Sequence, residues 1–322
     1  MYRILVTLPV TEEHKTLLES QDRGGVPCEF TYIDGDGKAD ELSAGEMDMI
    51  IGCPPVSVVP KLRKLSFLQL HSAGYETYAA PGVLPEGTLL ANASGAYGLA
   101  VSEHMLAMTF DVLRHFGRYH DQQREKVWVS DGYYHSVEGA VTVVVGLGDI
   151  GGDYARKMKA LGAYVIGIRK HDKPAPDYVD EQYTIDRLPE VLPRADIAAI
   201  VAPGGPETYH LFDEKALSSM KDDSILINVG RGSEIDPVPL KRLIKEGKFY
   251  GVALDVTEPE PLPEDDELWD LPGVLITPHS AGRFFLPETV TRIVRIAAKN
   301  VYALSHGTDF VNVVAKGSVI SG

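Results

Sequence analysis

The stretch Val141–Gly151 restricts the possible folds more than any other part of the chain. Its β-branched run VTVVV is typical of a strand buried on both faces of a sheet. Three glycines, Gly146, Gly148 and Gly151, follow directly and precede a helical pattern. In this context the first glycine permits a tight turn, the second lets the backbone approach a pyrophosphate, and the third lets helix and strand pack closely. The helix N-terminus offers free N–H groups to an anion, so the stretch predicts a dinucleotide-binding turn.

The rest of the chain alternates short apolar runs with helical patterns. Strands are predicted at 3–8, 29–33, 47–51, 67–71, 88–91, 141–145, 164–168, 197–201, 224–229, 251–255 and 274–277. Helices are predicted at 11–20, 98–120 and 153–161. Strands that alternate with helices indicate a parallel sheet covered on both faces. We therefore predict an α/β protein with two Rossmann-like halves, the second beginning near residue 100.

Composition narrows the functional classes. A chain of 322 residues suggests two domains. Its formal net charge of −15 argues against a general nucleic-acid binder, because an acidic surface repels phosphate backbones. The apolar runs are too short for a spanning helix, and the N-terminus does not resemble a signal peptide, so a cytoplasmic protein is expected. Cys28 and Cys53 are too few for a disulfide framework, and no metal site is expected.

Two cations follow the strand that comes after the glycine turn. Arg169 stands 23 positions after Gly146, with Lys170 next to it. A chain that binds NAD should carry an acid near this point to accept the ribose hydroxyl, whereas a guanidinium pairs with a 2′-phosphate. The pair therefore predicts NADP(H), with NAD(H) left possible. The alternative is a solvated cluster of cations at the edge of the sheet.

Three further polar segments follow predicted strands of the second half. They carry Arg231, then Asp255 with Glu260, and then His279. Ligands of open α/β sheets bind outside the carboxyl ends of the strands, so these side chains are expected at one edge. An Arg can bind a carboxylate or polarise a carbonyl, a His can supply a proton, and an acid can keep the imidazole charged. The set suits a ketone that carries a carboxylate.

Taken together, these motifs resemble the D-isomer-specific 2-hydroxyacid dehydrogenases, and among them the glyoxylate and hydroxypyruvate reductases. The resemblance covers nearly the whole chain and is densest from Val141 to Gly282. Its most specific segments are 145–151, 206–211, 228–232, 254–263 and 277–282.

The resemblance implies a role for each matching residue. Arg231 would be the substrate-binding and catalytic arginine, and His279 the proton donor. The catalytic acid would be Glu260 and not its neighbour Glu258. Asp255 would hold the carboxamide of the nicotinamide.

The remaining implied contacts lie in two loops. The segment HSAGY resembles the substrate loop of the family, in which the N–H groups of Ala73 and Gly74 would receive the carboxylate. The cofactor would be bound by Gly146, Gly148, Asp149, Ile150 and Gly151, together with Arg169 and Lys170. Asp149 departs from the usual pattern, because its charge would lie close to the pyrophosphate. It is also suited to capping the helix that follows.

The family further implies a discontinuous substrate domain, residues 1–98 and 284–322, around a dinucleotide-binding domain, 99–283. The active site would lie in the cleft between them, and the protein would be a homodimer.

The expected function is NADP-dependent reduction of a small 2-keto acid to the D-2-hydroxy acid. One alternative is a dinucleotide-sensing corepressor-like protein, since the family fold also serves in that role, although such a protein does not need the Arg–Glu–His set. Another is oxidation of formate or phosphite, which usually runs with NAD and is disfavoured by Arg169. A glycine-rich turn that binds no nucleotide is the remaining alternative.

Overall fold

The computed structural model describes residues 1–40, 44–130 and 132–318. The chain forms two compact units, each an α/β unit built on its own sheet. Unit 1 contains residues 1–97 and 284–322, and unit 2 contains residues 98–283. The sequence placed these divisions after residues 98 and 283, so the first differs by a single position.

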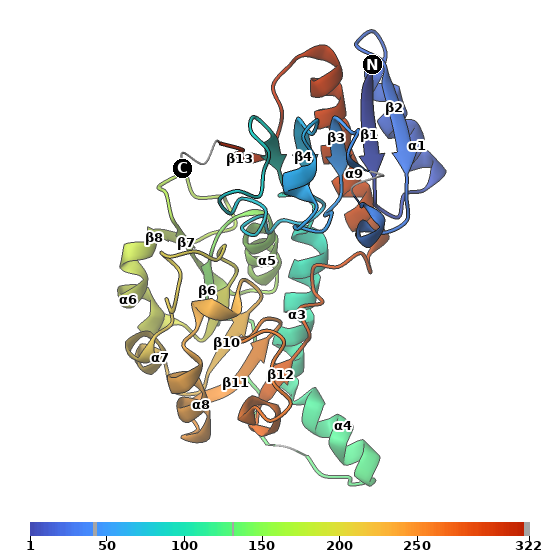
Figure 1. Cartoon of the computed structure of the whole chain (residues 1–322). Helices are drawn as coiled ribbons and strands as arrows, with labels where there is room; N and C mark the ends of the chain where they lie inside the picture. The colour runs from blue at the N-terminus through green and yellow to red at the C-terminus, as the bar shows by residue number, and fades with distance from the viewer. Residues whose placement is uncertain (41–43, 131, 319–322) are drawn as a thin grey trace. The chain divides into compact units, whose positions relative to one another are not determined.

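Unit 1 has a six-stranded sheet in the order β13-β5-β4-β3-β1-β2 (Figure 1). Its strands are β1 (Tyr2–Val6), β2 (Cys28–Tyr32), β3 (Met49–Ile51), β4 (Phe67–Gln69), β5 (Leu89–Ala91) and β13 (Val313–Lys316). The first five are parallel and follow the flavodoxin-like order, while β13 pairs with β5 in the antiparallel sense. The apolar runs of β1, β3, β4 and β5 are largely buried, as a covered parallel sheet requires, whereas the edge strands β2 and β13 are only partly buried.

Helices α1 (Glu12–Glu19) and α9 (Pro287–His306) of unit 1 pack against each other. Thr11 caps α1, since its hydroxyl accepts the N–H of His14. Gly307 ends α9 in the left-handed conformation, with φ of 67°. The C-terminal part of the chain, from residue 284, thus folds with the N-terminal 97 residues in unit 1.

Unit 2 has a seven-stranded parallel sheet in the order β12-β11-β10-β9-β6-β7-β8. The strands are β6 (Val141–Val145), β7 (Tyr164–Arg169), β8 (Glu181–Thr184), β9 (Ile197–Ile200), β10 (Ser224–Asn228), β11 (Phe249–Leu254) and β12 (Val274–Ile276). This is the Rossmann order with one added strand. The order reverses where β6 lies beside β9, and ligands of such sheets bind at that point.

Helices cover both faces of this sheet (Figure 1). Helices α3 (Gly98–Arg114) and α5 (Asp149–Ala160) pack together, and α3 also contacts β10 and β11. Helices α6 (Leu188–Val191), α7 (Glu214–Ser219) and α8 (Pro237–Lys245) share a second apolar core with the strands. The packing of α3 against β11 requires a glycine at position 251, because a Cβ there would lie 2.4 Å from a methyl carbon of Val112.

The structure differs from the sequence prediction at several helices and strands. The single helix predicted at 98–120 is two helices, because His115 adopts a left-handed conformation with φ of 56° and α4 (Phe116–Glu125) starts after it. The helix predicted to start at residue 153 already begins at Asp149. Strands β8 and β13 were not predicted, since both are edge strands with few apolar residues. Among the described residues, no helix combines the length and apolar character needed to cross a membrane.

Candidate active site

The glycine turn after β6 has the geometry that a dinucleotide requires. Gly146 has φ of 104°, and a Cβ there would lie 2.9 Å from the backbone of Val201 and Ala202. A Cβ on Gly151 would lie 1.9 Å from the carbonyl oxygen of Gly146, so only glycine allows α5 this close to β6. Gly148, the N-cap of α5, is exposed and open, and its backbone can approach a phosphate. The turn therefore fits a pyrophosphate group.

Asp149 has a structural role that the sequence did not predict. Its Oδ2 accepts the N–H of Gly98, the first residue of α3, over 2.6 Å. A Cβ on Gly98 would lie 2.6 Å from the same carboxylate, which explains a glycine there. Asp149 thus satisfies the start of α3, while α5 has no side-chain cap. The carboxylate of Asp149 thus caps α3 and not α5, the helix that begins at Asp149 itself.

Arg169 is the last residue of β7, and its Nε is buried without a hydrogen-bond partner among the described residues. Lys170 forms an exposed ion pair, with 2.6 Å between its Nζ and Oε2 of Glu207. Next to these residues, His171 and Arg187 help to line a hollow of about 230 Å³ at the ends of β7 and β8. A buried unpaired donor is costly, so the Nε of Arg169 is a group that an added acceptor would stabilise.

Arg231 follows β10 in a tight turn that its neighbours hold. The fully buried Asn228 donates to the carbonyl of Arg231 over 2.9 Å and accepts the N–H of Gly230 over 3.0 Å. A Cβ on Gly204 would lie 2.7 Å from Cγ of Arg231, so this glycine makes room for the arginine side chain. A Cβ on Gly232 would lie 1.9 Å from the carbonyl oxygen of Thr257. The Arg231 turn therefore packs directly against the loop after β11.

The side chains of His279 and Glu260 are in hydrogen-bond contact at the carboxyl end of the same sheet. Nδ1 of His279 lies 2.6 Å from Oε1 of Glu260, and both side chains are a little under half exposed. His279 has φ of 47°, a strained conformation for a histidine, and such strain is often found at functional sites. Its N–H donates to the backbone carbonyl of Asp255 over 2.8 Å. The chain thus brings together a histidine and an acid 19 residues apart.

Asp255 holds the loop that carries His279. Its side chain is 2% exposed. Oδ1 accepts the hydroxyl of Thr277 and the N–H of Ser280, and Oδ2 accepts the N–H of Ala281 over 3.2 Å. His104, on α3, contacts the Thr277 hydroxyl over 3.1 Å. From the sequence, His104 was left out of the site because the family resemblance implies a mainly structural role for it at an interface.

Ala73 and Gly74, the predicted substrate loop, belong to unit 1 and follow β4. Their carbonyl oxygens are occupied, one by the side-chain amide of Asn92 and the other by the hydroxyl of Ser72, each over 2.7 Å. Neither N–H group donates to another described residue. The loop therefore offers two backbone donors to a ligand.

Glu234 is a buried acid that sequence reasoning missed. Its side chain is fully buried, and Oε2 accepts the N–H of Arg231 over 2.8 Å. Oε1 has no partner among the described residues. Burial raises the pKa of Glu234 to about 7, although the Arg231 N–H and guanidinium oppose the shift. The acid sits in a run that otherwise suggests a solvated turn, so the sequence carried no signal for its burial.

The raised pKa of Glu234 predicts a pH-dependent stability. The folded protein binds this proton more tightly than the unfolded chain, so the stabilisation is complete below pH 4.5 and is lost as pH rises through about 7. The full shift corresponds to about 3 kcal/mol. We expect Glu234→Gln, which stays neutral, to flatten the pH dependence between 5 and 8, measured by urea unfolding. Equal pH dependence in both proteins would contradict this prediction.

The fold and this edge of polar side chains define a dinucleotide-binding α/β oxidoreductase. The model of the D-isomer specific 2-hydroxyacid dehydrogenase NAD binding domain matches residues 106–281. A glyoxylate reductase of Korarchaeum cryptofilum is 28% identical over 78% of this chain and 76% of that protein. The chain therefore belongs to the D-isomer specific 2-hydroxyacid dehydrogenase family, whose members use a nicotinamide dinucleotide with 2-keto and 2-hydroxy acids.

Solved structures agree with this fold. A D-isomer specific 2-hydroxyacid dehydrogenase family protein of Aeromonas salmonicida aligns over 98% of this chain and 99% of its own, with 26% identity and a TM-score of 0.82. An NADPH-dependent glyoxylate/hydroxypyruvate reductase of Sinorhizobium meliloti aligns over 98% of both chains, with 23% identity and a TM-score of 0.80. The predicted fold class is confirmed.

Proposed function

We propose that this protein uses NADPH to reduce a small 2-keto acid, of the glyoxylate or hydroxypyruvate kind, to the D-2-hydroxy acid. The observation that carries the proposal is the contact of 2.6 Å between His279 and Glu260 at the carboxyl edge of a dinucleotide-binding sheet. A corepressor-like protein has no need of a histidine held by an acid beside an arginine-bearing turn.

In this proposal Arg231 binds the substrate and His279 supplies the proton. A guanidinium is a planar donor with two prongs, so it can hold a carboxylate and polarise the adjacent carbonyl together. Nδ1 of His279 donates to Glu260, which fixes the ring and leaves Nε2 as the proton donor to the carbonyl oxygen. The N–H groups of Ala73 and Gly74 are proposed as further donors to the carboxylate. The bound dinucleotide supplies the hydride.

The cofactor is proposed to be held by the glycine turn and by the cations after β7. The N–H groups of Gly148, Asp149 and Ile150 at the start of α5 would face the pyrophosphate, and Gly146 and Gly151 keep the turn tight. The buried Nε of Arg169 has no partner among the described residues, which supports an acceptor beside it. The 2′-phosphate of NADP, which NAD lacks, is such an acceptor. Lys170 would first have to leave Glu207, at a small cost for so exposed a pair. Asp255 is proposed to contact the nicotinamide carboxamide.

The decisive experiment is an NADPH oxidation assay with a panel of 2-keto acids, followed by chiral analysis of the product. The proposal requires consumption of NADPH with glyoxylate or hydroxypyruvate, and a D product where the product is chiral. Oxidation of formate or phosphite with NAD, and not reduction of keto acids, would overturn it. Dinucleotide binding without turnover of any acid would favour the corepressor-like alternative.

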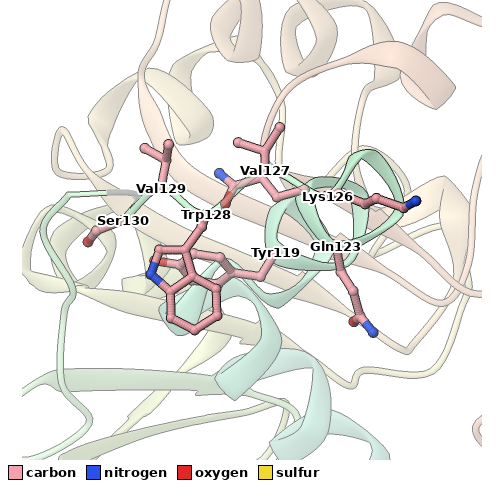
Figure 2. A pocket seen from close by; sticks show the side chains of 8 residues that line it. Tyr119, Gln123, Lys126, Val127, Trp128, Val129 and Ser130 are labelled. Atoms are coloured by element: carbon pink, nitrogen blue, oxygen red, sulfur yellow. The ribbon is translucent and has the colours of Figure 1, made fainter.

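We further propose a homodimer formed through the segment after α4. A hollow of about 620 Å³ is lined by α4 and the chain beyond it. Figure 2 shows Trp128 among the side chains that line it. Trp128 is 100% exposed, Val129 60% and Tyr133 93%. A fully exposed tryptophan beside exposed apolar side chains is typical of protein interfaces. A second copy of the chain is the partner that the family resemblance implies.

Light scattering after size exclusion tests the dimer. The wild type is expected at twice the chain mass of 35.1 kDa. Replacing an interface tryptophan costs about 2 kcal/mol or more, which is roughly 30-fold in affinity. Trp128→Ser should therefore shift the protein toward monomer at micromolar concentration, whereas Val238→Ser, on the exposed face of α8, should not. A monomeric wild type would refute the proposal.

A further inference from the structure

Unit 1 contains a cluster of three different metal-binding side chains. Asp36, Cys53 and His71 each offer one ligand atom, and these atoms all lie within 4.8 Å of one another. Cys53 follows β3 and His71 follows β4, while Asp36 lies in the turn after β2. In the sheet, β3 and β4 are neighbours, and β1 alone separates β3 from β2. All three residues follow the carboxyl ends of their strands. The three residues are too far apart in the sequence to form a recognisable metal-binding motif, so only the fold brings them together.

The surrounding backbone keeps the cluster tight. Oδ2 of Asp36 lies 2.7 Å from Nε2 of His71, and Oδ1 accepts the N–H of Cys53 over 2.8 Å. The hydroxyl of Thr7 also donates to Oδ1. Gly52 makes this approach possible, because a Cβ there would overlap the Thr7 hydroxyl and lie 2.9 Å from Oδ1. The carboxylate is thus oriented from one side, which leaves Oδ2 toward the histidine.

The histidine has spare binding capacity. Its Nδ1 is buried and has no hydrogen-bond partner among the described residues. The side chain is 16% exposed, and the ring of Phe284 packs edge-on against it with 4.8 Å between the ring centres. The imidazole is therefore fixed in place, with one nitrogen on Asp36 and one unsatisfied.

We propose that Asp36, Cys53 and His71 bind one divalent transition-metal ion, with Zn²⁺ as the expected occupant. A thiolate and an imidazole disfavour Mg²⁺ and Ca²⁺, which prefer oxygen ligands, and they suit zinc. Three protein ligands leave a fourth tetrahedral position for water or another small ligand. None of the three side chains was given a role in the proposed reaction, although His71 is the first residue of the HSAGY segment that also carries Ala73 and Gly74.

The geometry is close to what zinc requires. Zinc bond lengths of about 2.0–2.3 Å place tetrahedral ligand atoms roughly 3.3–3.8 Å apart. The His71–Asp36 contact of 2.7 Å must therefore open by about half an ångström when an ion binds. Because a thiol binds a metal ion as the thiolate, binding is expected to release a proton.

The test uses the full-length protein after treatment with a chelator. Titration with Zn²⁺ in a calorimeter is expected to give one site per chain, with a heat that depends on the buffer because protons are released. Co²⁺ in place of zinc should give the absorption band of a sulfur-to-cobalt bond. Zn²⁺ should also protect Cys53, but not Cys28, from alkylation by iodoacetamide.

The chain offers a matched control in its other cysteine. Burial and Asp22 raise the pKa of Cys28 to about 11, and it lies outside the cluster. Cys53→Ser should weaken Zn²⁺ binding by more than about 100-fold, beyond the ~10–100-fold typical of a residue that only orients a ligand. Cys28→Ser should bind as the wild type does.

A second variant tests the site even if Cys53→Ser fails to fold. Asp36→Asn preserves the shape of the side chain and should also weaken binding, with an unchanged circular dichroism spectrum. Equal Zn²⁺ affinity in the wild type and Cys53→Ser would overturn the proposal. So would loss of the site in Cys28→Ser, or a wild type that binds no zinc.

Discussion

His279→Gln is expected to reduce turnover of the 2-keto acid by ~10²–10⁴-fold, the usual contribution of a positioned proton donor. Glutamine keeps the size and polarity of the side chain but cannot release a proton to the developing alkoxide. The dissociation constant for NADPH should stay within a few-fold, because the glycine turn and Arg169 lie on other loops. Steady-state kinetics for turnover and fluorescence titration for NADPH measure the two effects separately.

The acid that assists His279 has a matched control beside it in the sequence. Glu258 contacts His210 over 2.7 Å, much as Glu260 contacts His279 over 2.6 Å. Glu260→Gln should lower turnover, because the carboxylate that holds Nδ1 of His279 is lost. Glu258→Gln should leave turnover unchanged. The opposite result would assign catalysis to the His210 pair, and unchanged turnover in both variants would refute the role of Glu260.

Arg169→Asp is expected to reverse the choice of cofactor. A charge-assisted contact to the 2′-phosphate contributes about 1.5–3 kcal/mol, which is roughly 10- to 150-fold in preference for NADPH. An aspartate at this position would repel the phosphate and accept the ribose hydroxyls instead. The specificity constants for NADPH and NADH, measured in the wild type and the variant, give the reversal directly.

Lys170→Ala is the matched comparison for cofactor choice. Lys170 is exposed and paired with Glu207, so its loss should change the preference much less than the loss of Arg169. Equal use of both cofactors by the wild type would show that Arg169 does not contact a phosphate. No change in Arg169→Asp would lead to the same conclusion.

Local sequence predicted the buried parallel strands and the turns between them. The β-branched run at 141–145 and the glycines behind it can form little else, because the pattern satisfies strand, turn and helix together. Arg231, Glu260 and His279 were found because each follows an apolar run, and carboxyl ends of parallel strands share an edge. The structure does bring His279 and Glu260 into contact.

Other features depended on contacts that the sequence does not display. The edge strands β8 and β13 lack a strong apolar pattern, since an edge strand is buried on fewer sides. The break at His115 contradicts the continuous helical periodicity of 98–120, because periodicity reports apolar faces and not backbone direction.

The sequence by itself therefore determined the fold class, the dinucleotide turn and the residues at the ends of the strands, since each is a local pattern. Only the tertiary structure decided that Asp149 caps α3, that Glu234 is buried beneath Arg231, and that Asp255 holds the His279 loop. It alone also joined Asp36, Cys53 and His71. The reason is physical: hydrogen bonding, burial and metal affinity depend on distances between side chains, and the sheet order that sets those distances is not written in neighbouring residues.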